Sequence, residues 1–538
     1  MKSKFMSLGF CLGLVVFGFV SPVPSKLTTA GPVVWLEDGM TWVFQDDPVK
    51  SNSSITLYSA KNEYEPFQIV VRAPAGNDLT NVNVSMSDFT GPGYAQISAD
   101  NITLYREHYV QVTQGSDFKN GTNNPLGPGW YPDALIPFED PDTHQDLTGR
   151  FDAVPFDLPS GQNQPIWVDV YVPPGAPSGE YQATATVSSD QGSASLQIHL
   201  SVWNFTLPEK RSLGAFTHVF EPYNSLATQI DLLKHRFNPK YVSRSDERFL
   251  IDHYGFDIAN VYDWSHASYR HCEIDPPPSV ADVLESTADH QPELYLYTAY
   301  ANEIWPCTDI YPELMTWANN LRMGGAHPVL VMYPIDELMG PDLDHTAADI
   351  WVVLPKHFDQ AKENIDKLIA HEGTEVWSYN PINQDDFSPK LVIDFLPINS
   401  RIMHGFINQS LGLTGSKIWR VDYWTSDPWT DVDSLRLDAP GDGAMVYPGD
   451  DVGLPGQVVS GMRMKWFREG SEDYEYIQIL KNMGQGGFAM PVVRGVGLDF
   501  HTWTQDKDVL YAARKVLGDR IDLESYFPKV YLPIAFER

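Results

Sequence analysis

Residues 327–338 read HPVLVMYPIDEL, an apolar run that ends in two adjacent carboxylates, Asp336 and Glu337. A continuous apolar run predicts a strand buried on both faces, which is typical of a parallel sheet. In parallel barrels, active sites lie at the carboxyl ends of the strands. We therefore predict that Asp336 and Glu337 are catalytic. The alternative is that this pair only solvates a loop, as most acidic pairs do.

Similar apolar runs recur through the second part of the chain. Strands are predicted at 213–220, 293–300, 328–333, 350–354, 375–379, 417–423 and 444–447. Helix-like segments such as 356–371 and 458–481 lie between them. This alternation predicts an α/β fold, a (β/α)₈ barrel of the TIM type over residues 213–520, followed by a C-terminal tail, 521–538.

The first part of the chain has a different periodicity. Apolar residues alternate with polar or larger ones in segments such as 166–172, 181–188 and 196–202, and Pro and Gly separate these segments. Period-two alternation is typical of antiparallel strands with one buried face. Residues 31–206 are predicted to form a β-sandwich, and 207–212 to link it to the barrel.

The amino terminus has the pattern of an export signal. Lys2 and Lys4 precede an apolar run, 5–20, and Ser25 ends a small-residue segment that suits signal peptidase. Residues 1–25 are therefore predicted to be a signal peptide, and the protein to be secreted or periplasmic. No later stretch reaches the roughly 20 apolar residues that a membrane helix needs.

The amino-acid composition favours some classes of ligand over others. The formal net charge is −33, which argues against nucleic acid and anionic lipid and favours a neutral ligand. The 15 Trp and 26 Tyr suit a sugar ligand, because aromatic faces cover the apolar faces of pyranose rings. After removal of the signal, only Cys272 and Cys307 remain, and they could form a disulfide in an oxidising compartment.

Aromatic and polar residues follow several of the later predicted strands. They are Trp377, Tyr379, Asn380, Trp419, Asp422, Tyr423, Trp424 and Tyr447. Together they could line one cleft, although a single Trp or Tyr is more often a packing residue. Asn380 could equally cap a loop. Arg236 is a further candidate substrate contact. No set of His, Asp, Glu and Cys has metal-ligand spacing, so no metal or cofactor is expected.

Several blocks, in this order, resemble glycoside hydrolase family 123, the bacterial β-N-acetylgalactosaminidases. They are 63–68 (EYEPFQ), 333–337 (YPIDE), 349–352 (DIWV), 375–379 (EVWSY), 419–424 (WRVDYW), 427–429 (DPW), 443–449 (GAMVYPG) and 466–475 (WFREGSEDYE). The resemblance covers nearly the whole mature chain. The sequence departs from the family pattern at Pro334 and Leu338, which puts the shape of the sugar subsite in question.

The resemblance implies a retaining exo-β-N-acetylhexosaminidase that acts on glycans with a terminal β-linked sugar. The 2-acetamido group of the substrate would be the nucleophile, an exception to the usual two-carboxylate schemes. Glu337 would be the general acid and base, and Asp336 would orient the acetamido group, with Tyr379 or Tyr447 donating to its carbonyl. Two alternatives stay open: a glycosidase with Asp422 as nucleophile, and a carbohydrate-binding or surface-associated protein without turnover.

Overall fold

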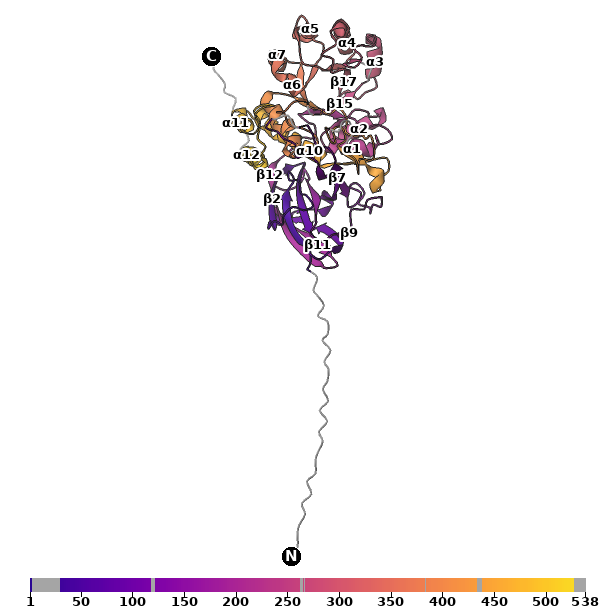
Figure 1. The fold of residues 1–538 in the computed structure, drawn as a ribbon. Helices are drawn as coiled ribbons and strands as arrows, with labels where there is room; N and C mark the ends of the chain where they lie inside the picture. The colour runs from indigo at the N-terminus through magenta and orange to yellow at the C-terminus, as the bar shows by residue number, and fades with distance from the viewer. Residues whose placement is uncertain are drawn as a thin grey trace, which may run out of the picture.

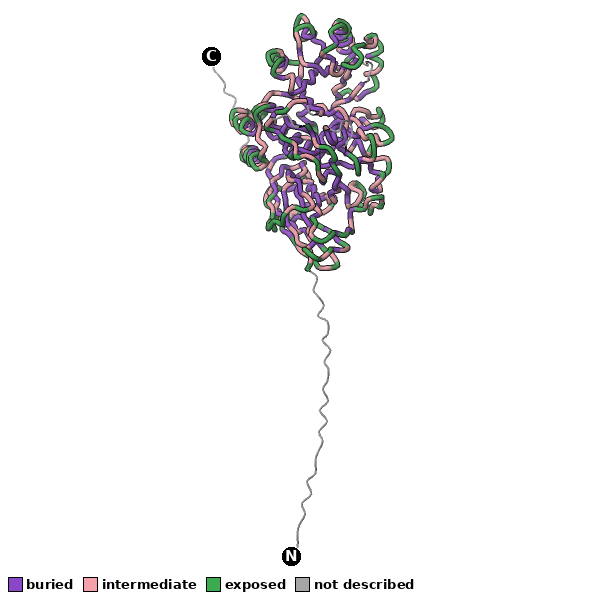
Figure 2. Tube along the Cα trace, viewed as in Figure 1, coloured by how far each residue is buried: buried purple, intermediate pink, exposed green. Residues whose placement is uncertain are grey.

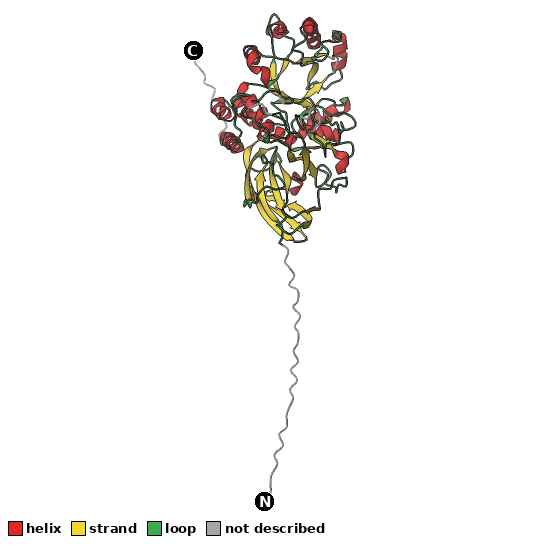
Figure 3. Ribbon diagram, viewed as in Figure 1, coloured by secondary structure: helices red, strands yellow, loops and turns green. Residues whose placement is uncertain are grey.

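A sandwich and a barrel lie end to end in the computed structural model (Figures 1 and 3). The structure describes residue 1 and residues 30–117, 121–261, 265, 267–382, 384–432 and 438–526. The predicted signal peptide, apart from Met1, lies outside the described residues.

The sandwich consists of two sheets. The first has the order β1 (Val33–Asp38), β3 (Glu63–Arg72), β10 (Asn163–Val172), β7 (Ile102–Val112) and β8 (Gly129–Pro137). The second has the order β2 (Ser54–Lys61), β12 (Gly192–Thr206), β11 (Gly179–Ser189), β4 (Leu79–Met86) and β9 (Phe156–Leu158). All ladders between these strands are antiparallel except β2–β12. The predicted alternation is present in β10, whose Ile166, Val168 and Val170 face the sandwich core.

Parallel strands form the barrel. Their order is β14 (Asn238–Pro239), β13 (Gly214–Thr217), β21 (Gly415–Lys417), β20 (Glu375–Tyr379), β19 (Ile350–Val353), β18 (His327–Val331), β17 (Tyr295–Asn302) and β15 (Ile258–Asn260). A short strand, β16 (Ala267–Ser268), also pairs with β17. The described residues show no ladder between β14 and β15, so the eight-stranded barrel is nearly closed.

The barrel differs from the prediction in three respects. The strand predicted at 444–447 is β22 (Val446–Pro448), which pairs with β23 (Val458–Ser460) in a hairpin outside the barrel sheet. The eighth barrel strand, β21, ends at Lys417, where the prediction began it. The strands β14 and β15 were not predicted, because two or three residues are too few to show a periodicity.

Helices cover the barrel (Figure 3). They are α1 (Leu226–Lys234), α2 (Arg244–Tyr254), α3 (Val280–Thr287), α4 (Tyr311–Met323), α5 (Asp336–Met339), α6 (Pro355–Phe358), α7 (Lys362–Ala370), α8 (Ile398–Ile402), α9 (Asn408–Leu411), α10 (Met462–Asn482), α11 (Gly486–Val496) and α12 (Lys507–Ser525). The last helix, α12, runs past the predicted barrel boundary at residue 520.

The sandwich and the barrel share a buried junction around α10, in the purple centre of Figure 2. The Arg468 guanidinium donates to both carboxylate oxygens of Asp169 on β10, at 3.1 and 2.8 Å. This contact explains why β10 is buried on both faces, whereas the alternation predicted one buried face. Residues 207–212, the predicted linker, also pack here, because Arg211 donates to three backbone carbonyls of the barrel.

Candidate active site

A cavity of about 530 Å³ lies at the carboxyl ends of barrel strands β17, β20 and β21. This is the end of a parallel barrel where active sites are built. Its lining is aromatic and polar, and the described residues contribute a single carboxylate, that of Glu303. The lining residues are Ser268, Tyr269, Arg270, His271, Asn302, Glu303, Tyr379, Pro381, Ile382, Gln384, Trp419 and Tyr423.

Glu303 directly follows β17 and is half-buried. Its backbone has φ of +55°, in the left-handed region that residues other than glycine rarely adopt. Such conformations persist where the surrounding structure enforces them, and they cluster at active sites. Burial raises the pKa of the Glu303 carboxyl above its ordinary value, against the opposing effect of nearby cations. Glu303 is therefore suited to hold a proton and to donate it.

Side chains from three strands converge on Glu303. The Tyr379 hydroxyl, at the end of β20, faces Glu303, and the two groups affect each other's pKa. Lys417, at the end of β21, donates to the Asn302 side-chain oxygen at 3.0 Å, and its ammonium lies 4.8 Å from the centre of the Tyr379 ring. The four residues form one contact network across the barrel interior, so each fixes the orientation of the next.

A second acid lies behind Trp419. The Trp419 indole nitrogen donates to Asp442 at 3.1 Å, and the Ile382 backbone nitrogen donates to the other carboxylate oxygen at 3.2 Å. Asp442 is only 5% exposed, and burial raises its pKa to about 6. Repulsion from Glu303 contributes to this shift. Two acids that influence each other are thus present near the cavity, one in its lining and one behind it.

The loop that carries Arg270 is tied to the strand that carries Glu303. Cys272 and Cys307 form a disulfide, with Cα atoms 4.9 Å apart. On the other side of the loop, β16 pairs with the last residues of β17, so that Ser268 lies opposite Asn302. The loop therefore has a fixed position at the rim of the cavity.

The predicted pair Asp336 and Glu337 does not line this cavity. Both side chains are exposed at the start of α5, and Asp336 accepts a hydrogen bond from Asn364 of α7 at 3.1 Å. Four residues separate the end of β18 at Val331 from Asp336. The chain has therefore left the strand end before it reaches the pair, and the geometry favours Glu303 over Glu337 as the catalytic acid.

The other predicted site residues divide into two groups. Tyr379, Trp419 and Tyr423 line the cavity with Glu303. The remaining ones are engaged elsewhere. The Trp377 indole is buried against Phe216 lower in the barrel. The Asn380 amide donates to Ser388 and to the Pro389 carbonyl, so it organises a loop.

Asp422 and Trp424 also lie outside the lining of the cavity. The Asp422 carboxylate, 3% exposed, accepts from the Arg420 side chain at 2.5 Å and from the Phe220 backbone at 2.8 Å. The Trp424 indole donates to the Val446 carbonyl at 2.9 Å and packs edge-on against Tyr223. Both side chains thus hold loops that follow the barrel strands.

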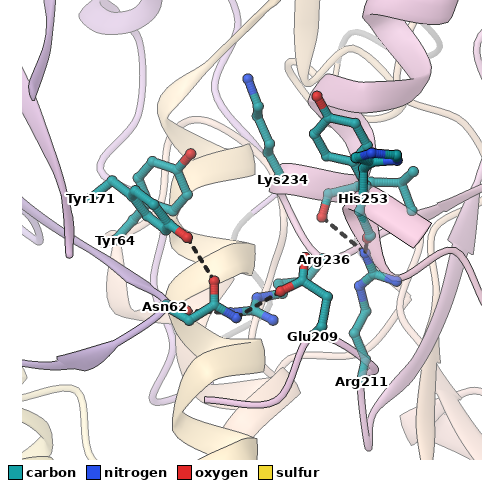
Figure 4. A pocket seen from close by; sticks show the side chains of 10 residues that line it. Asn62, Tyr64, Tyr171, Glu209, Arg211, Lys234, Arg236 and His253 are labelled. Carbon is teal, nitrogen blue, oxygen red and sulfur yellow. Dashed lines mark hydrogen bonds between the residues drawn. The ribbon is translucent and has the colours of Figure 1, made fainter. Parts of the chain in front are cut away.

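Two further candidates lie at the junction with the sandwich. The Tyr447 hydroxyl donates to Asp133 of β8 at 2.6 Å in the buried interior. Arg236 lines a small cavity between Tyr64 and Tyr171 of the sandwich and the ends of α1 and α2, shown in Figure 4. Its guanidinium donates to the backbone carbonyls of Pro208 and Asn62. Arg236 precedes β14, so it lies at the amino ends of the strands, away from Glu303.

The sequence analysis missed Asn302, Glu303, Arg270 and Lys417. One signal was available for Glu303, because it follows the predicted strand 293–300 by three residues. In the described part of the chain, no three His, Cys, Asp or Glu side chains are grouped as metal ligands. No helix formed by the described residues is long and apolar enough to cross a membrane.

Comparison with protein families gives two matches in chain order. Residues 44–189 match the glycoside hydrolase 123 N-terminal domain, and residues 332–480 match the glycoside hydrolase 123 catalytic domain. The chain belongs to glycoside hydrolase family 123. It is therefore a glycoside hydrolase, as the resemblance predicted. Glu303 precedes the matched catalytic segment, so its assignment rests on the geometry of the cavity.

One solved structure has the same fold as this chain over most of its length. A family 123 glycoside hydrolase from Clostridium perfringens, studied for glycolipid glycan hydrolysis, superposes with a TM-score of 0.66 and 13% identity, covering 92% of this chain and 99% of that one. Bacteroides uniformis β-glucuronidase 3 reaches a TM-score of only 0.26, at 10% identity over 81% of this chain and 52% of that one. No curated protein sequence matches this family 123 chain.

Proposed function

We propose that this family 123 enzyme removes a terminal β-linked N-acetylhexosamine, with N-acetylgalactosamine as the preferred sugar, and that it retains the anomeric configuration. The observation that carries the proposal is Glu303: a protonatable carboxyl with a raised pKa, held in a left-handed backbone conformation in an aromatic-lined cavity at the carboxyl end of the barrel. This is the environment that a general acid requires.

The reaction would proceed in two steps without a protein nucleophile. In the first, Glu303 protonates the glycosidic oxygen as the acetamido oxygen of the substrate attacks C1, so that the aglycone leaves as an alcohol and a cyclic oxazolinium forms. In the second, the Glu303 carboxylate takes a proton from water while the water oxygen attacks C1 and reopens the ring. One water is consumed, and the configuration at C1 is retained by double inversion.

Neighbouring side chains would position the sugar. Trp419 and Tyr423 offer aromatic faces for the pyranose ring. The acetamido group would lie against Asn302 and Tyr379, which contact Lys417 and Glu303 respectively. Asn302 thus takes the orienting role that the sequence analysis gave to Asp336. As a neutral amide it orients the acetamido group without adding negative charge.

Because Asn302 is neutral, a second mechanism with a nucleophile from the protein is also considered. An oxazolinium is cationic, and a neutral Asn302 beside the Lys417 ammonium stabilises it less than a carboxylate would. In the second mechanism, Asp442 is the partner carboxylate of Glu303, and the acetamido group takes no part. Asp422 is less suitable, because it is ion-paired with Arg420, whereas Trp419 and Ile382 donate neutral N–H groups to Asp442. A thiazoline mimic of the cyclised acetamido group inhibits only under the first mechanism.

Hydrolysis of 4-nitrophenyl β-N-acetylgalactosaminide tests the main proposal. We expect turnover by the wild type, a loss of about 10²- to 10⁴-fold in Glu303→Gln, and wild-type turnover in the matched control Glu337→Gln. Equal activity on the corresponding β-galactoside would remove the acetamido group from the mechanism. Loss of activity in Glu337→Gln with retention in Glu303→Gln would return the catalytic role to the pair at 336–337.

We also propose that the enzyme acts outside the cytoplasm. The export signal pattern of residues 1–25 supports this, as does the disulfide between Cys272 and Cys307, because disulfides persist mainly in oxidising compartments. Detection of the mature chain in culture medium or periplasm, with a new amino terminus near residue 26, is the test.

A further inference from the structure

Three cations act on Glu303, although the protein as a whole is strongly anionic. The chain carries a formal net charge of −33, yet Lys417, Lys356 and Arg270 all exert an attractive field on the Glu303 carboxylate. Among the described residues that line the cavity, Glu303 is the only carboxylate. The mouth of the barrel is therefore a cationic site on a strongly anionic protein.

Arg270 differs from Lys356 and Lys417 in its exposure, because its guanidinium is exposed whereas the two lysines are half-buried. Within the described residues, no carboxylate lies within 4.0 Å of it, and its Nε donates to the Tyr269 hydroxyl at 3.2 Å. By contrast, Arg420 is paired with Asp422, and Arg150 and Arg248 elsewhere each face a carboxylate. Arg494 on α11 is also exposed and has no carboxylate within 4.0 Å among the described residues, but it lies away from the cavity.

The position of Arg270 is fixed relative to the reacting centre. The backbone nitrogens of His271 and Cys272 both donate to the Ser268 carbonyl, which closes a tight turn around Arg270. The β16–β17 ladder precedes this turn, and the disulfide to Cys307 follows it. A side chain on such a loop has less conformational freedom to lose when it binds a ligand.

We propose that Arg270 forms an anion subsite for the substrate, so that the natural substrate is an acidic glycan with a carboxylate or sulfate within about one sugar of the scissile bond. The inference rests on the proposed function and names its substrate class. The planar guanidinium presents two parallel N–H groups, which match the oxygens of a carboxylate or a sulfate ester. The two sources share this chemistry, and the experiment separates them.

Equilibrium binding to the Glu303→Gln enzyme tests the subsite without turnover. The probes are methyl β-N-acetylgalactosaminide, its 6-sulfate, and methyl glycosides of the disaccharides in which N-acetylgalactosamine is linked to glucose or to glucuronate. We expect at least one acidic probe to bind about 10-fold or more tightly than its neutral counterpart, with a preference that weakens as salt is raised. A preference for the sulfate identifies an ester, and a preference for the glucuronate identifies a carboxylate.

Variants of Arg270 test whether this residue causes the preference for acidic probes. When Arg270→Gln is combined with Glu303→Gln, the ratio of acidic to neutral affinity should fall to about one, and Arg270→Lys should retain part of the preference. The matched control, Arg494→Gln on α11, removes the same charge from an exposed helix and should leave the ratio unchanged. Absence of a preference for either acidic probe, including absence of binding, overturns the inference, as does an unchanged ratio in Arg270→Gln. If the wild-type enzyme does not hydrolyse the neutral 4-nitrophenyl β-N-acetylgalactosaminide, the proposed function fails. That result is separate from the test of Arg270.

Discussion

Charged side chains gather in two regions of this enzyme, the junction around α10 and the mouth of the barrel. At the junction, every cation faces acids: Arg468 and Lys465 both contact Asp169, at 2.8 and 2.9 Å. Arg401 and Arg514 share Asp473, at 2.8 and 2.7 Å. All of these side chains are buried.

The mouth has a different balance. Glu303 is half-buried, its backbone is in the left-handed region, and three cations act on it. The described lining residues include no other carboxylate. Buried charges that are fully paired hold two domains in one arrangement. In the mouth, the exposed Arg270 guanidinium remains accessible to a ligand. The charges of the junction therefore stabilise the fold, whereas those of the mouth are available for substrate binding and catalysis.

The largest expected effect is at the junction. Asp169→Asn leaves Arg468 and Lys465 buried without their anion, and should lower the free energy of unfolding by about 3–5 kcal/mol. Denaturant unfolding measures this. The matched control, Asp252→Asn in an exposed pair with Arg248, should cost less than about 1 kcal/mol.

The pH dependence of this contribution has a definite sign. The nearby cations hold the pKa of the Asp169 carboxyl well below its ordinary value, against the effect of burial. Its stabilisation is therefore present above the ordinary pKa of an aspartate and is lost as the pH falls. If Asp169→Asn and Asp252→Asn lower the free energy of unfolding equally, the buried ion pairs of the junction contribute no more to stability than an exposed pair.

The next largest effect is expected from removal of the disulfide at the mouth of the barrel. Its cysteines are 35 residues apart, so the double variant Cys272→Ser, Cys307→Ser should lose about 3–4 kcal/mol of stability on the chain-entropy model. Thermal unfolding with and without reductant measures this, because reductant should act on the wild type and not on the variant. Unchanged stability in the double variant would show that the loop is held by the β16–β17 ladder alone.

A smaller effect concerns pH. Lys417 favours the ionised form of Glu303, so Lys417→Met should raise the pKa of the Glu303 carboxyl further. A general acid works while it is protonated, so the alkaline limb of the kcat/KM profile should move to higher pH. The control Lys515→Met, on α12, should leave that limb in place. A limb that moves to lower pH in Lys417→Met contradicts the electrostatic account of the mouth.

The smallest effect is expected at the first predicted site. Asp336 is exposed at the start of α5, where it accepts a hydrogen bond from Asn364. Asp336→Asn should change stability by no more than about 0.5 kcal/mol and should leave turnover at the wild-type level. A large loss of turnover would place the catalytic centre at α5 after all.

The sequence predicted the fold better than the site. Apolar runs of four or more residues marked most barrel strands, and the strand at 375–379 was predicted with its observed ends. The sequence also predicted that Tyr379, Trp419 and Tyr423 lie at the ends of strands, and these three residues line the cavity. Trp377 lies on the same strand as Tyr379, but it packs against Phe216 deeper in the barrel, and a sequence pattern does not show depth.

The choice of acid could not be made from the pattern alone. Both Glu303 and Glu337 follow predicted strands closely. What separates them is the backbone between strand and acid: Glu303 directly follows β17, whereas the chain runs four residues beyond β18 before Asp336. Burial, φ and neighbouring cations follow from that difference, and all three depend on tertiary contacts.

The dependence on the leaving group tests the role of Glu303 most directly. A dinitrophenolate leaves without protonation, whereas an alkyl alcohol needs a proton from the general acid. We predict that Glu303→Gln loses about 10²- to 10⁴-fold in kcat/KM on a methyl or sugar aglycone, and much less on the 2,4-dinitrophenyl glycoside. An equal loss on both substrates, or no loss on either, would contradict the assignment of Glu303 as the acid.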